Sequence, residues 1–358
     1  MSEIVRPKGG VTARGQSVTL ALAAVYLLWG GTFLGNKVAL ESLPPLVLTA
    51  SRFIAGGALI LIGARLLGRR VWPGGRQFAA ASLVGLFLVG GGSSLLAVGQ
   101  QYVDSGLAAL VISSMPLWAL VLGRLMGSRP SRTALIGIGA GFVGLALLVG
   151  ASITAVEVSY GVLILLVSTL LWAIGSMTAQ RLDMPGDALV SSGWQMLTGG
   201  AVVALFVLAR GGPGDLVDVT VTGRSALAWV ALTVLSTAVG YSCYAWLLQN
   251  ATLRLATTYA YVNPVVAVVL GAAVLGERLT WAQAPGALII LAAVALVVAA
   301  EQRVVEPAAA VLNVTADHGA NSVAPPTEPT LGAGDALLPT VQLVDGRGGV
   351  SDHQGRTS

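Results

Sequence analysis

The chain has 358 residues, of which 55% are hydrophobic and only 10% are charged, and its mean hydropathy is +0.81. Soluble globular domains carry about 25% charged residues, so this composition excludes a soluble globule and indicates an integral membrane protein. The formal net charge of +4 does not point to a nucleic-acid partner, because the basic residues flank apolar segments instead of forming a patch.

The chain begins with a short basic tail, residues 1–16, which carries Arg6, Lys8 and Arg14. A basic start before an apolar run is also typical of a cleaved signal peptide. Here the apolar run extends from Ser17 to about Gly35, which is too long for the apolar core of a signal peptide, and it ends without a small-residue cleavage pattern. We therefore expect a cytoplasmic N-terminal tail followed by a retained first membrane span.

Apolar stretches of about 20 residues, the length that crosses a bilayer as a helix, follow one another along the chain. They predict an all-α polytopic membrane protein with ten transmembrane helices, over residues 18–36, 45–67, 77–99, 105–126, 133–151, 160–180, 187–209, 225–248, 254–275 and 281–300. From Glu301 the composition changes to Pro, Gly, Asp and small residues, which cannot bury enough apolar surface to fold. Residues 301–358 are therefore expected to form a disordered cytoplasmic tail.

The lysines and arginines predict the orientation of these spans, because cytoplasmic segments of membrane proteins are enriched in both residues. With the N-terminus inside, the segments assigned to the outer face carry only Lys37, Arg210, Arg224 and Arg278. The segments assigned to the inner face carry many more, namely Arg6, Lys8, Arg14, Arg65, Arg69, Arg70, Arg76, Arg124, Arg129, Arg132, Arg181, Arg254 and Arg303. Both termini are therefore expected to be cytoplasmic, with the chain in the plasma membrane.

The first and second parts of the chain repeat one another. At an offset of 143 residues, the run 27–29 matches the run 170–172 and the run 53–58 matches the run 196–201; at an offset of 148, Met115-Pro116 corresponds to Asn263-Pro264. We expect one five-helix repeat over residues 17–151 and a second over residues 152–300. Because five is odd, the two copies would lie upside down relative to one another. That is the inverted arrangement of many secondary transporters, whose solute site lies between the repeats near the midplane.

Several short motifs occur in order along both repeats, namely Trp29-Gly30-Gly31-Thr32-Phe33, Pro44-Pro45 with Arg52-Phe53, Trp194-Gln195, Asn263-Pro264 and Leu275-Gly276-Glu277. Taken together, they resemble the EamA-type transporters of the drug/metabolite transporter superfamily over roughly residues 18–300. The resemblance implies a ten-helix inverted-repeat carrier that exports small metabolites, often amino acids or their derivatives. One position departs from a simple duplication: Gly276-Glu277 ends the ninth span, whereas Gly127-Ser128 ends the fourth.

The predicted ninth span contains Pro264 directly after Asn263, and Tyr259 and Tyr261 lie close by in the sequence. A proline within a helix removes one backbone hydrogen bond and kinks the helix, and in a bilayer the freed carbonyl needs a partner or a polar cavity. Polar groups would thus gather where a permeating solute could bind, and Tyr261 and Asn263 are candidate substrate contacts. The alternative is a packing kink that a neighbouring helix satisfies.

Arg52 lies about a third of the way into the second span, where a charge costs about 2.5 kcal/mol or more unless it has a partner. A carrier of anions or amino acids could use this side chain to bind a carboxylate. The alternatives are that it reaches the interface or that it bonds to carbonyls as a fixed strut. Gln195 is its counterpart in the second repeat and would present a neutral hydrogen-bonding group, so the two repeats would offer unlike groups to a solute.

Aromatic and polar residues form helical stripes in three spans. Trp29, Phe33 and Asn36 share one helix face by their three- and four-residue spacing, as do Trp172 and Ser176, and Thr237 with Tyr241 and Tyr244. Such stripes line a cavity in some membrane proteins and fill the core in others, and both readings stay open here. The substrate-site candidates are Trp29, Asn36, Arg52, Trp118, Trp172, Gln195, Tyr241, Tyr244, Tyr261 and Asn263.

An enzymatic function would need a nucleophile with a base, or metal ligands, at membrane depth. His318 and His353 both lie in the C-terminal tail, Cys243 has no histidine nearby in the sequence, and no acidic pair occurs within a span. Glu277 at a helix end is expected to cement a loop, with Arg278 or Arg132 as its partner. We therefore expect no catalytic residue, no metal and no cofactor, and the coupling mechanism stays open.

The sequence thus favours a secondary transporter that exports small metabolites, such as amino acids or their derivatives, by alternating access. The alternatives are an importer, an exporter of drug-like or sugar-conjugate solutes, and, in another class, an intramembrane enzyme. Its partners would be a small-molecule substrate and the lipid bilayer. Nothing in the sequence sets the oligomeric state, with which a monomer is compatible.

Overall fold

All regular secondary structure is helical in the computed structural model, which describes residues 10–127, 130–152, 156–211, 220–251 and 258–297. The all-α class is thereby confirmed for these residues. The predicted tail over residues 301–358 and the first nine residues lie outside them.

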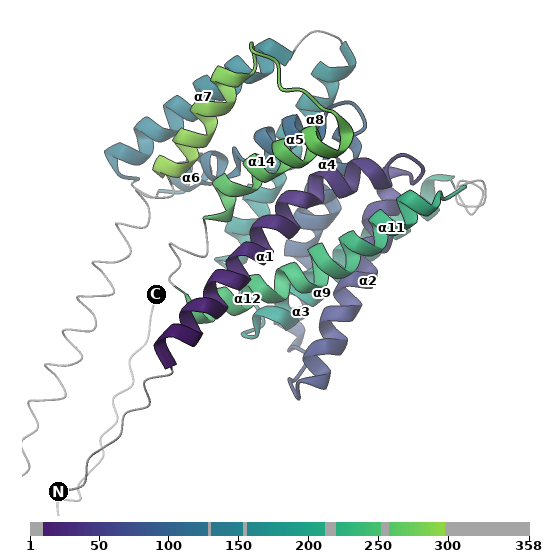
Figure 1. Cartoon of the computed structure of the whole chain (residues 1–358). Coiled ribbons are helices and arrows are strands. Elements are labelled where there is room, and N and C mark those ends of the chain that lie inside the picture. The colour runs from purple at the N-terminus through teal and green to yellow at the C-terminus, as the bar shows by residue number, and fades with distance from the viewer. Residues whose placement is uncertain (1–9, 128–129, 153–155, 212–219, 252–257, 298–358) are drawn as a thin grey trace, which may run out of the picture. The chain divides into compact units, whose positions relative to one another are not determined.

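The first half of the described chain forms helices whose labels follow Figure 1, where η denotes a π-helical segment. They are α1 (Gly10–Ala39), α2 (Pro45–Leu66), α3 (Gly75–Gly85), η1 (Leu86–Ser93), α4 (Ser94–Gly99), α5 (Ser105–Ile112), α6 (Met115–Leu125) and α7 (Arg132–Ser152).

The second half of the described chain continues in the same way. Its helices are α8 (Val156–Ala179), α9 (Ala188–Gly211), α11 (Gly223–Ala231), η2 (Leu232–Val239), α12 (Gly240–Asn250), α14 (Tyr259–Leu270) and η3 (Gly271–Leu275). Each half therefore has a π-helical segment in the middle of its third predicted span. Segments of this kind occur frequently at functional sites.

Eight helices in the described part of the chain are long and apolar enough to cross a membrane, and two shorter apolar helices, Val262–Leu275 and Ala284–Val297, follow them. The first eight predicted spans begin and end within a few residues of the eight long helices. The ninth and tenth predicted spans include residues 254–257 and 298–300, which the structure does not describe.

The two proline-bearing spans differ in local structure. Pro264 lies inside α14, as predicted. The fourth span, in contrast, stops at Ile112 and restarts at Met115, so that Pro116 occupies the first turn of α6. Proline is well tolerated there, because the backbone N–H groups of the first helical turn have no acceptor within the helix. The chain therefore interrupts the helix at this point instead of bending it.

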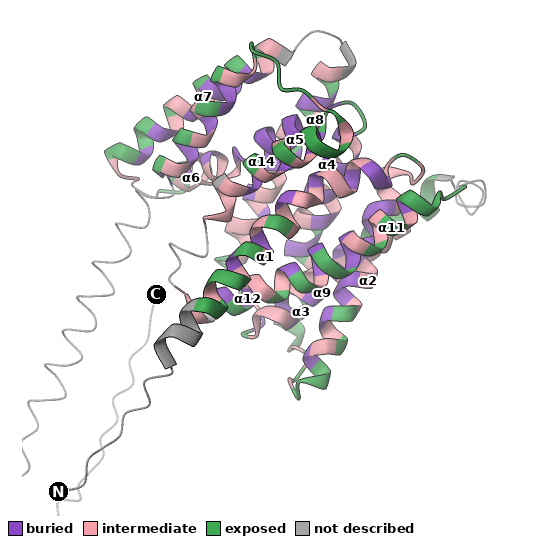
Figure 2. Cartoon of the chain, in the orientation of Figure 1, coloured by how far each residue is buried: buried purple, intermediate pink, exposed green. Residues whose placement is uncertain are grey.

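The distribution of polarity is that of a membrane protein. Large apolar side chains such as Leu66 and Leu227 lie exposed on the helix surfaces, and Arg52, Asn36 and Gln100 lie buried between the helices. Figure 2 shows exposed and buried residues following one another along the same helices. Apolar surface of this kind is suited to contact with lipid, and buried polar residues within such a bundle mark candidate functional positions.

Three sets of helix contacts bring the two halves together. α2 packs along α9, α1 packs against α11, η2, α12 and α14, and α8 packs against α3, η1, α4, α5 and α6. α1 can be followed beside α12 and α14 in Figure 1. The first helix of each half thus lies against the third-span helices of the other half.

Candidate functional site

The crossing of α2 and α9 is reciprocal. A Cβ atom added at Gly57 of α2 would lie 2.8 Å from the carbonyl oxygen of Gly193, and one added at Gly200 of α9 would lie 3.2 Å from that of Ala50. Gly200 and Gly193 follow Gly57 and Ala50 by the same 143 residues. The two helices therefore touch backbone to backbone through equivalent positions.

Two tryptophans make a second reciprocal contact. The indole nitrogen of Trp29 in α1 donates to the carbonyl oxygen of Ser236 in η2 over 3.1 Å. The indole nitrogen of Trp172 in α8 donates to that of Leu88 in η1 over 2.7 Å. Trp172 follows Trp29 by 143 residues and Ser236 follows Leu88 by 148, which are the two offsets of the sequence repeat. Each indole thus bonds to the π-helical segment of the other half.

Arg52 lies at the centre of a buried polar network. Its side chain is 6% exposed; its Nε donates to Thr237 Oγ1 and its Nη1 to Asn36 Oδ1, each over 3.0 Å. Asn36 Nδ2 donates in turn to Gln100 Oε1 over 2.9 Å, and Gln100 Nε2 donates to the carbonyl oxygen of Phe33 over 3.1 Å. Four segments of the chain, namely α1, α2, η2 and the residue after α4, therefore hold the guanidinium in place.

The Arg52 network contains a positive charge but no negative one. The ion pairs of the described residues are Arg69 with Asp187 and Arg224 with Glu41, so within that part of the chain Arg52 is bonded to neutral oxygens. Burying a charge without an opposite charge is unfavourable. The arrangement therefore favours an anionic group as a further partner.

The repeat does not duplicate this network. The counterparts of Arg52 and Asn36 by the 143-residue offset are Gln195 and Ala179, and the counterpart of Thr237 by the 148-residue offset is Val89. Gln195 donates to Ser191 Oγ within its own helix over 2.9 Å. The polar network and its charge therefore have no equivalent at the related positions of the other repeat.

Four aromatic rings form a cluster beside the network. The ring of Trp29 lies 5.0 Å from that of Tyr241, 5.1 Å from that of Tyr244 and 4.9 Å from that of Tyr259, centroid to centroid. Tyr241 also packs against the buried cluster that contains Phe53, the residue after Arg52. We call these four rings the aromatic box. The rings pack tilted or edge to face on one another, and an aromatic face that a ligand can reach attracts cations.

The structure brings some of the predicted residues together and leaves others apart. Trp29, Tyr241 and Tyr244 meet in the aromatic box, and Asn36 and Arg52 meet in the network. Trp172 and Gln195 make the separate contacts described above. Trp118 packs edge-on against Phe142 with a ring distance of 5.1 Å. Their role as substrate contacts stays a prediction.

Two predicted residues at the proline helices have unsatisfied polar atoms. Asn263 is 8% exposed, and its Oδ1, like the indole nitrogen of Trp118, is buried without a hydrogen-bond partner among the described residues. Most buried polar groups are hydrogen-bonded, so both atoms are available to a bound solute or water. The side chain of Tyr261 lies outside the described residues.

Sequence reasoning missed two residues of the site. Gln100 is fully buried and joins Asn36 to the backbone of α1, but in the sequence it is one polar residue at the end of a span, where polar residues are common. Tyr259 completes the aromatic box. It lies near the Asn263-Pro264 kink in the sequence but is not among the substrate-site candidates named from the sequence, although it lies four residues before Asn263 on the same helix face.

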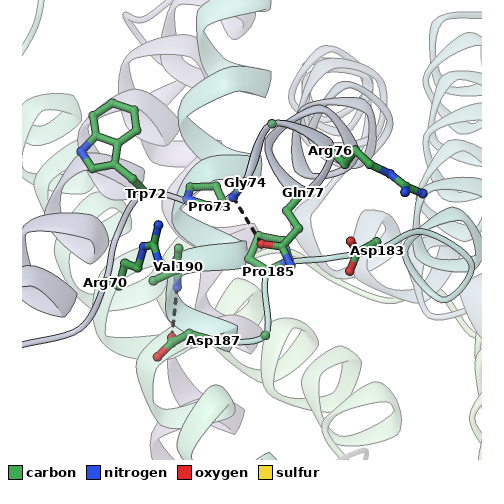
Figure 3. Close-up of a pocket in the computed structure, with 12 residues that line it drawn as sticks. Arg70, Trp72, Pro73, Gly74, Arg76, Gln77, Asp183, Pro185, Asp187 and Val190 are labelled. Atoms are coloured by element: carbon green, nitrogen blue, oxygen red, sulfur yellow. Dashed lines mark hydrogen bonds between the residues drawn. The ribbon is translucent and has the colours of Figure 1, made fainter.

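A hollow of about 540 Å³ lies elsewhere, between the α2–α3 and α8–α9 loops. Figure 3 shows Arg70, Trp72, Arg76 and Asp183 around it. Asp187 also lines it; burial opposes ionisation of its carboxyl, but the hydrogen bond and charge of Arg69 and two backbone N–H groups outweigh burial and hold its pKa below the ordinary value. The hollow is lined by loop residues and helix ends, not by the aromatic box.

Comparison with known proteins yields a family and a fold. The family model described as the EamA-like transporter family matches residues 16–150 and again residues 159–299. A solved structure, described only as the crystal structure of a protein, superposes with a TM-score of 0.56 at 22% identity, covering 78% of this chain and 96% of that one. That likeness concerns the fold alone.

Two curated relatives are described as transporters. The chain is 33% identical over 262 residues to the uncharacterized inner membrane transporter YedA of Escherichia coli, which covers 73% of this chain and 83% of that protein. It is 25% identical over 292 residues to the uncharacterized transporter YvbV of Bacillus subtilis, which covers 78% of this chain and 90% of that protein.

Proposed function

The chain belongs to the EamA-like transporter family, and from this membership we propose that it is a secondary transporter that exports small metabolites with a carboxylate, such as amino acids or their derivatives. It acts in the plasma membrane by alternating access of two inverted five-helix repeats, residues 17–151 and 152–300. The transport role follows from the family, whereas the substrate class, the direction and the inverted arrangement are the proposal.

The proposed substrate class rests on the buried charge of Arg52, which no carboxylate of the described residues compensates. A substrate carboxylate would supply the negative charge that the described residues do not place beside the guanidinium, and arginine binds a carboxylate in a geometrically specific way. The aromatic box would hold the rest of the solute, including an ammonium group through its π-faces. A zwitterion fits this combination better than a purely apolar solute does.

The reciprocal contacts support the inverted repeats. A two-fold relation between the repeats requires that a contact from one copy to the other be matched by its exchanged counterpart. Gly57 with Gly193 is matched by Gly200 with Ala50, and the bond of Trp29 to η2 is matched by that of Trp172 to η1. A carrier built this way can alternate its access by moving one repeat against the other.

The loop contacts support the predicted alternation of the spans up to the seventh. Glu41 pairs with Arg224 over 3.4 Å, and both residues belong to loops predicted to face outward. Arg69 pairs with Asp187; Arg69 belongs to a loop predicted to face inward, and Asp187 is the first residue of the seventh predicted span, at the same face. The lysine and arginine bias then assigns the Arg69 end to the cytoplasm.

The proposal is tested by amino-acid release from bacterial cells that are fed dipeptides, with and without the protein, across all twenty amino acids. We expect faster release of a subset of them. Arg52→Gln should abolish this increase at unchanged membrane expression. Arg210→Gln is the matched control: this arginine lies over the ring of Phe206 at the end of α9, away from the network, and its variant should keep the wild-type rate.

Two results would contradict the proposal. If the Arg52→Gln variant releases amino acids at the wild-type rate, Arg52 does not bind the substrate carboxylate. No change in release for any amino acid, with the wild-type protein folded in the membrane, would exclude amino-acid export and direct the search to import and to other metabolites or drugs.

A further inference from the structure

Glu277 joins the end of η3 to the beginning of α5. Its Oε1 accepts a hydrogen bond from the backbone N–H of Ser105 over 2.9 Å, and its Oε2 accepts from the Ser105 hydroxyl over 2.7 Å and from the N–H of Gly106 over 3.2 Å. The sequence-based expectation that Glu277 cements a structural junction fits this arrangement. The expected partners, Arg278 and Arg132, were wrong, because the carboxylate instead caps a helix start.

The local turn directs the Glu277 carboxylate to this position. Gly276 has a φ of +70°, the left-handed conformation that commonly ends a helix. The N–H of Glu277 then donates to the carbonyl oxygen of Gly271 over 3.2 Å, so the chain folds back over the last turn of η3. A Cβ atom at Gly271 would lie 2.7 Å from the Ser105 hydroxyl and would also meet the Glu277 carboxylate, so only glycine leaves room for this contact.

The contact connects the two proline-bearing spans at one end. α5 packs against α14, and a Cβ atom at Gly106 would lie 3.1 Å from the side chain of Val268. Lys37 binds the same loop, because its ammonium donates to the carbonyl oxygens of Gln100 over 3.0 Å and of Val103 over 2.7 Å. The ends of α1, α5 and η3 are thereby held together on the face predicted to be external.

The opposite end of the same pair of spans lacks this carboxylate. The fourth span ends with Gly127-Ser128 where the ninth ends with Gly276-Glu277, one residue away from the 148-residue offset. A serine hydroxyl carries no charge. A backbone N–H that donates to a neutral oxygen makes a hydrogen bond roughly half as strong as one that donates to a carboxylate. The sequence therefore provides a charged latch for one end of the carrier and none at the equivalent position of the other.

We infer that Glu277 sets the resting conformation of the carrier by latching its external end shut. This inference rests on the proposed alternating access. If opening of the external end separates α5 from η3, the three hydrogen bonds of Glu277 are made only in the conformation that is closed outside and open to the cytoplasm. Interactions present in one of two conformations shift the population towards it. At rest the carrier then presents its site to cytoplasmic substrate, as an exporter requires.

The experiment measures distances between pairs of spin labels in the full-length protein, purified and placed in lipid nanodiscs, with Cys243→Ala removing the native thiol. Gln101→Cys with Leu279→Cys reports on the external end, and Met126→Cys with Leu182→Cys reports on the cytoplasmic end. All four positions are exposed. No substrate is needed, so the measurement is independent of the substrate's identity.

Glu277→Gln should lower the ratio of closed to open external ends by about tenfold, the effect of roughly one charge-assisted hydrogen bond. The cytoplasmic pair should shorten in the same samples. Gly271→Ala displaces the carboxylate without changing the charge and should act in the same direction. Glu41→Gln is the matched control, because this carboxylate lies at the same end in an exposed ion pair and its variant should keep the wild-type distances.

Unchanged external distances in both Glu277→Gln and Gly271→Ala, with a monodisperse gel-filtration profile, would overturn the latch and leave the proposed transport untouched. A longer external distance with no change at the cytoplasmic end would contradict alternating access itself. That result would overturn both the preference for the externally closed conformation and the proposed transport mechanism.

Discussion

At the scale of single residues, Gln100 shapes the candidate site although we expect it to make no contact with the substrate. It directly follows the third predicted span, is fully buried and accepts a hydrogen bond from the amide of Asn36, whose oxygen in turn accepts from Arg52. Without Gln100 the Asn36 amide can rotate, and the guanidinium loses a defined acceptor. Gln100 is thus a positioning residue for Arg52.

We expect Gln100→Ala to destabilise the protein by about 1–3 kcal/mol, because it leaves the buried side-chain NH₂ group of Asn36 without its acceptor and removes a second hydrogen bond to the carbonyl of Phe33. Thermal unfolding in detergent measures this effect. Export should also fall, with a larger rise in KM than a loss of maximal rate, since the variant misplaces a binding group. Gln101→Ala, at the exposed neighbouring position, should change neither quantity; equal effects of the two variants would refute the positioning role.

Arg52 and Asn36 could be proposed from sequence, because a charge and an amide within apolar spans are conspicuous. The assignment of partners could not. The Arg52 network joins residues 36, 52, 100 and 237, and no periodicity within one helix relates residues on different helices. The absence of a carboxylate beside Arg52 in the described residues is likewise a property of packing and not of the sequence pattern.

At the scale of helices, the α2–α9 crossing illustrates what the repeat does and does not predict. The paired glycines, Gly56-Gly57 and Gly199-Gly200, are visible as a match at the 143-residue offset. Small residues allow helix backbones to approach closely in membranes, but the sequence does not say which helices approach. The structure supplies the answer: Gly57 and Gly200 lie where α2 and α9 touch, whereas Gly56 faces η2 and Gly199 faces the end of α3.

Gly57→Leu should therefore reduce the yield of folded protein severely, because its side chain would collide with the α9 backbone at a position where even a Cβ atom has no room. The fluorescence of a C-terminal tag during gel filtration measures the folded fraction. Gly63→Leu on the same helix is the control, since a Cβ atom there meets nothing within 4 Å. A normal folded yield for Gly57→Leu would contradict the backbone contact between α2 and α9.

The proline-bearing spans show where sequence reasoning reaches its limit within one helix. A proline predicts a lost hydrogen bond, but a helix can respond by bending or by stopping and restarting. α14 retains Pro264 in its interior, whereas α5 and α6 separate before Pro116. Ser113 and Ser114 donate their hydroxyls to the carbonyls of Leu110 and Val111 over 2.7 and 2.6 Å. Such side-chain bonds to the backbone compete with a continuous helix.

At the scale of the whole molecule, hydropathy locates the spans well because the bilayer imposes both their length and their composition. It does not establish which loops meet. The two ion pairs join segments that the predicted alternation assigns to one face, and one span too many or too few between residues 76 and 187 would have put both pairs on opposite faces. The contacts and the alternation are therefore mutually consistent, while the direction of the whole array rests on the lysine and arginine bias alone.

That direction can be measured by thiol labelling in intact cells. In a Cys243→Ala background, Val221→Cys should react with a membrane-impermeant maleimide from outside, because it precedes α11 in a loop predicted to be external. Gly186→Cys, beside the Arg69–Asp187 pair, should react only after permeabilisation. Both positions are exposed, so access to the reagent decides the result. The reverse pattern would show that the protein has the opposite orientation in the membrane. The Glu277 latch would then close the cytoplasmic end and favour uptake. Labelling of both positions in intact cells would contradict the single span, residues 187–209, that is predicted between them.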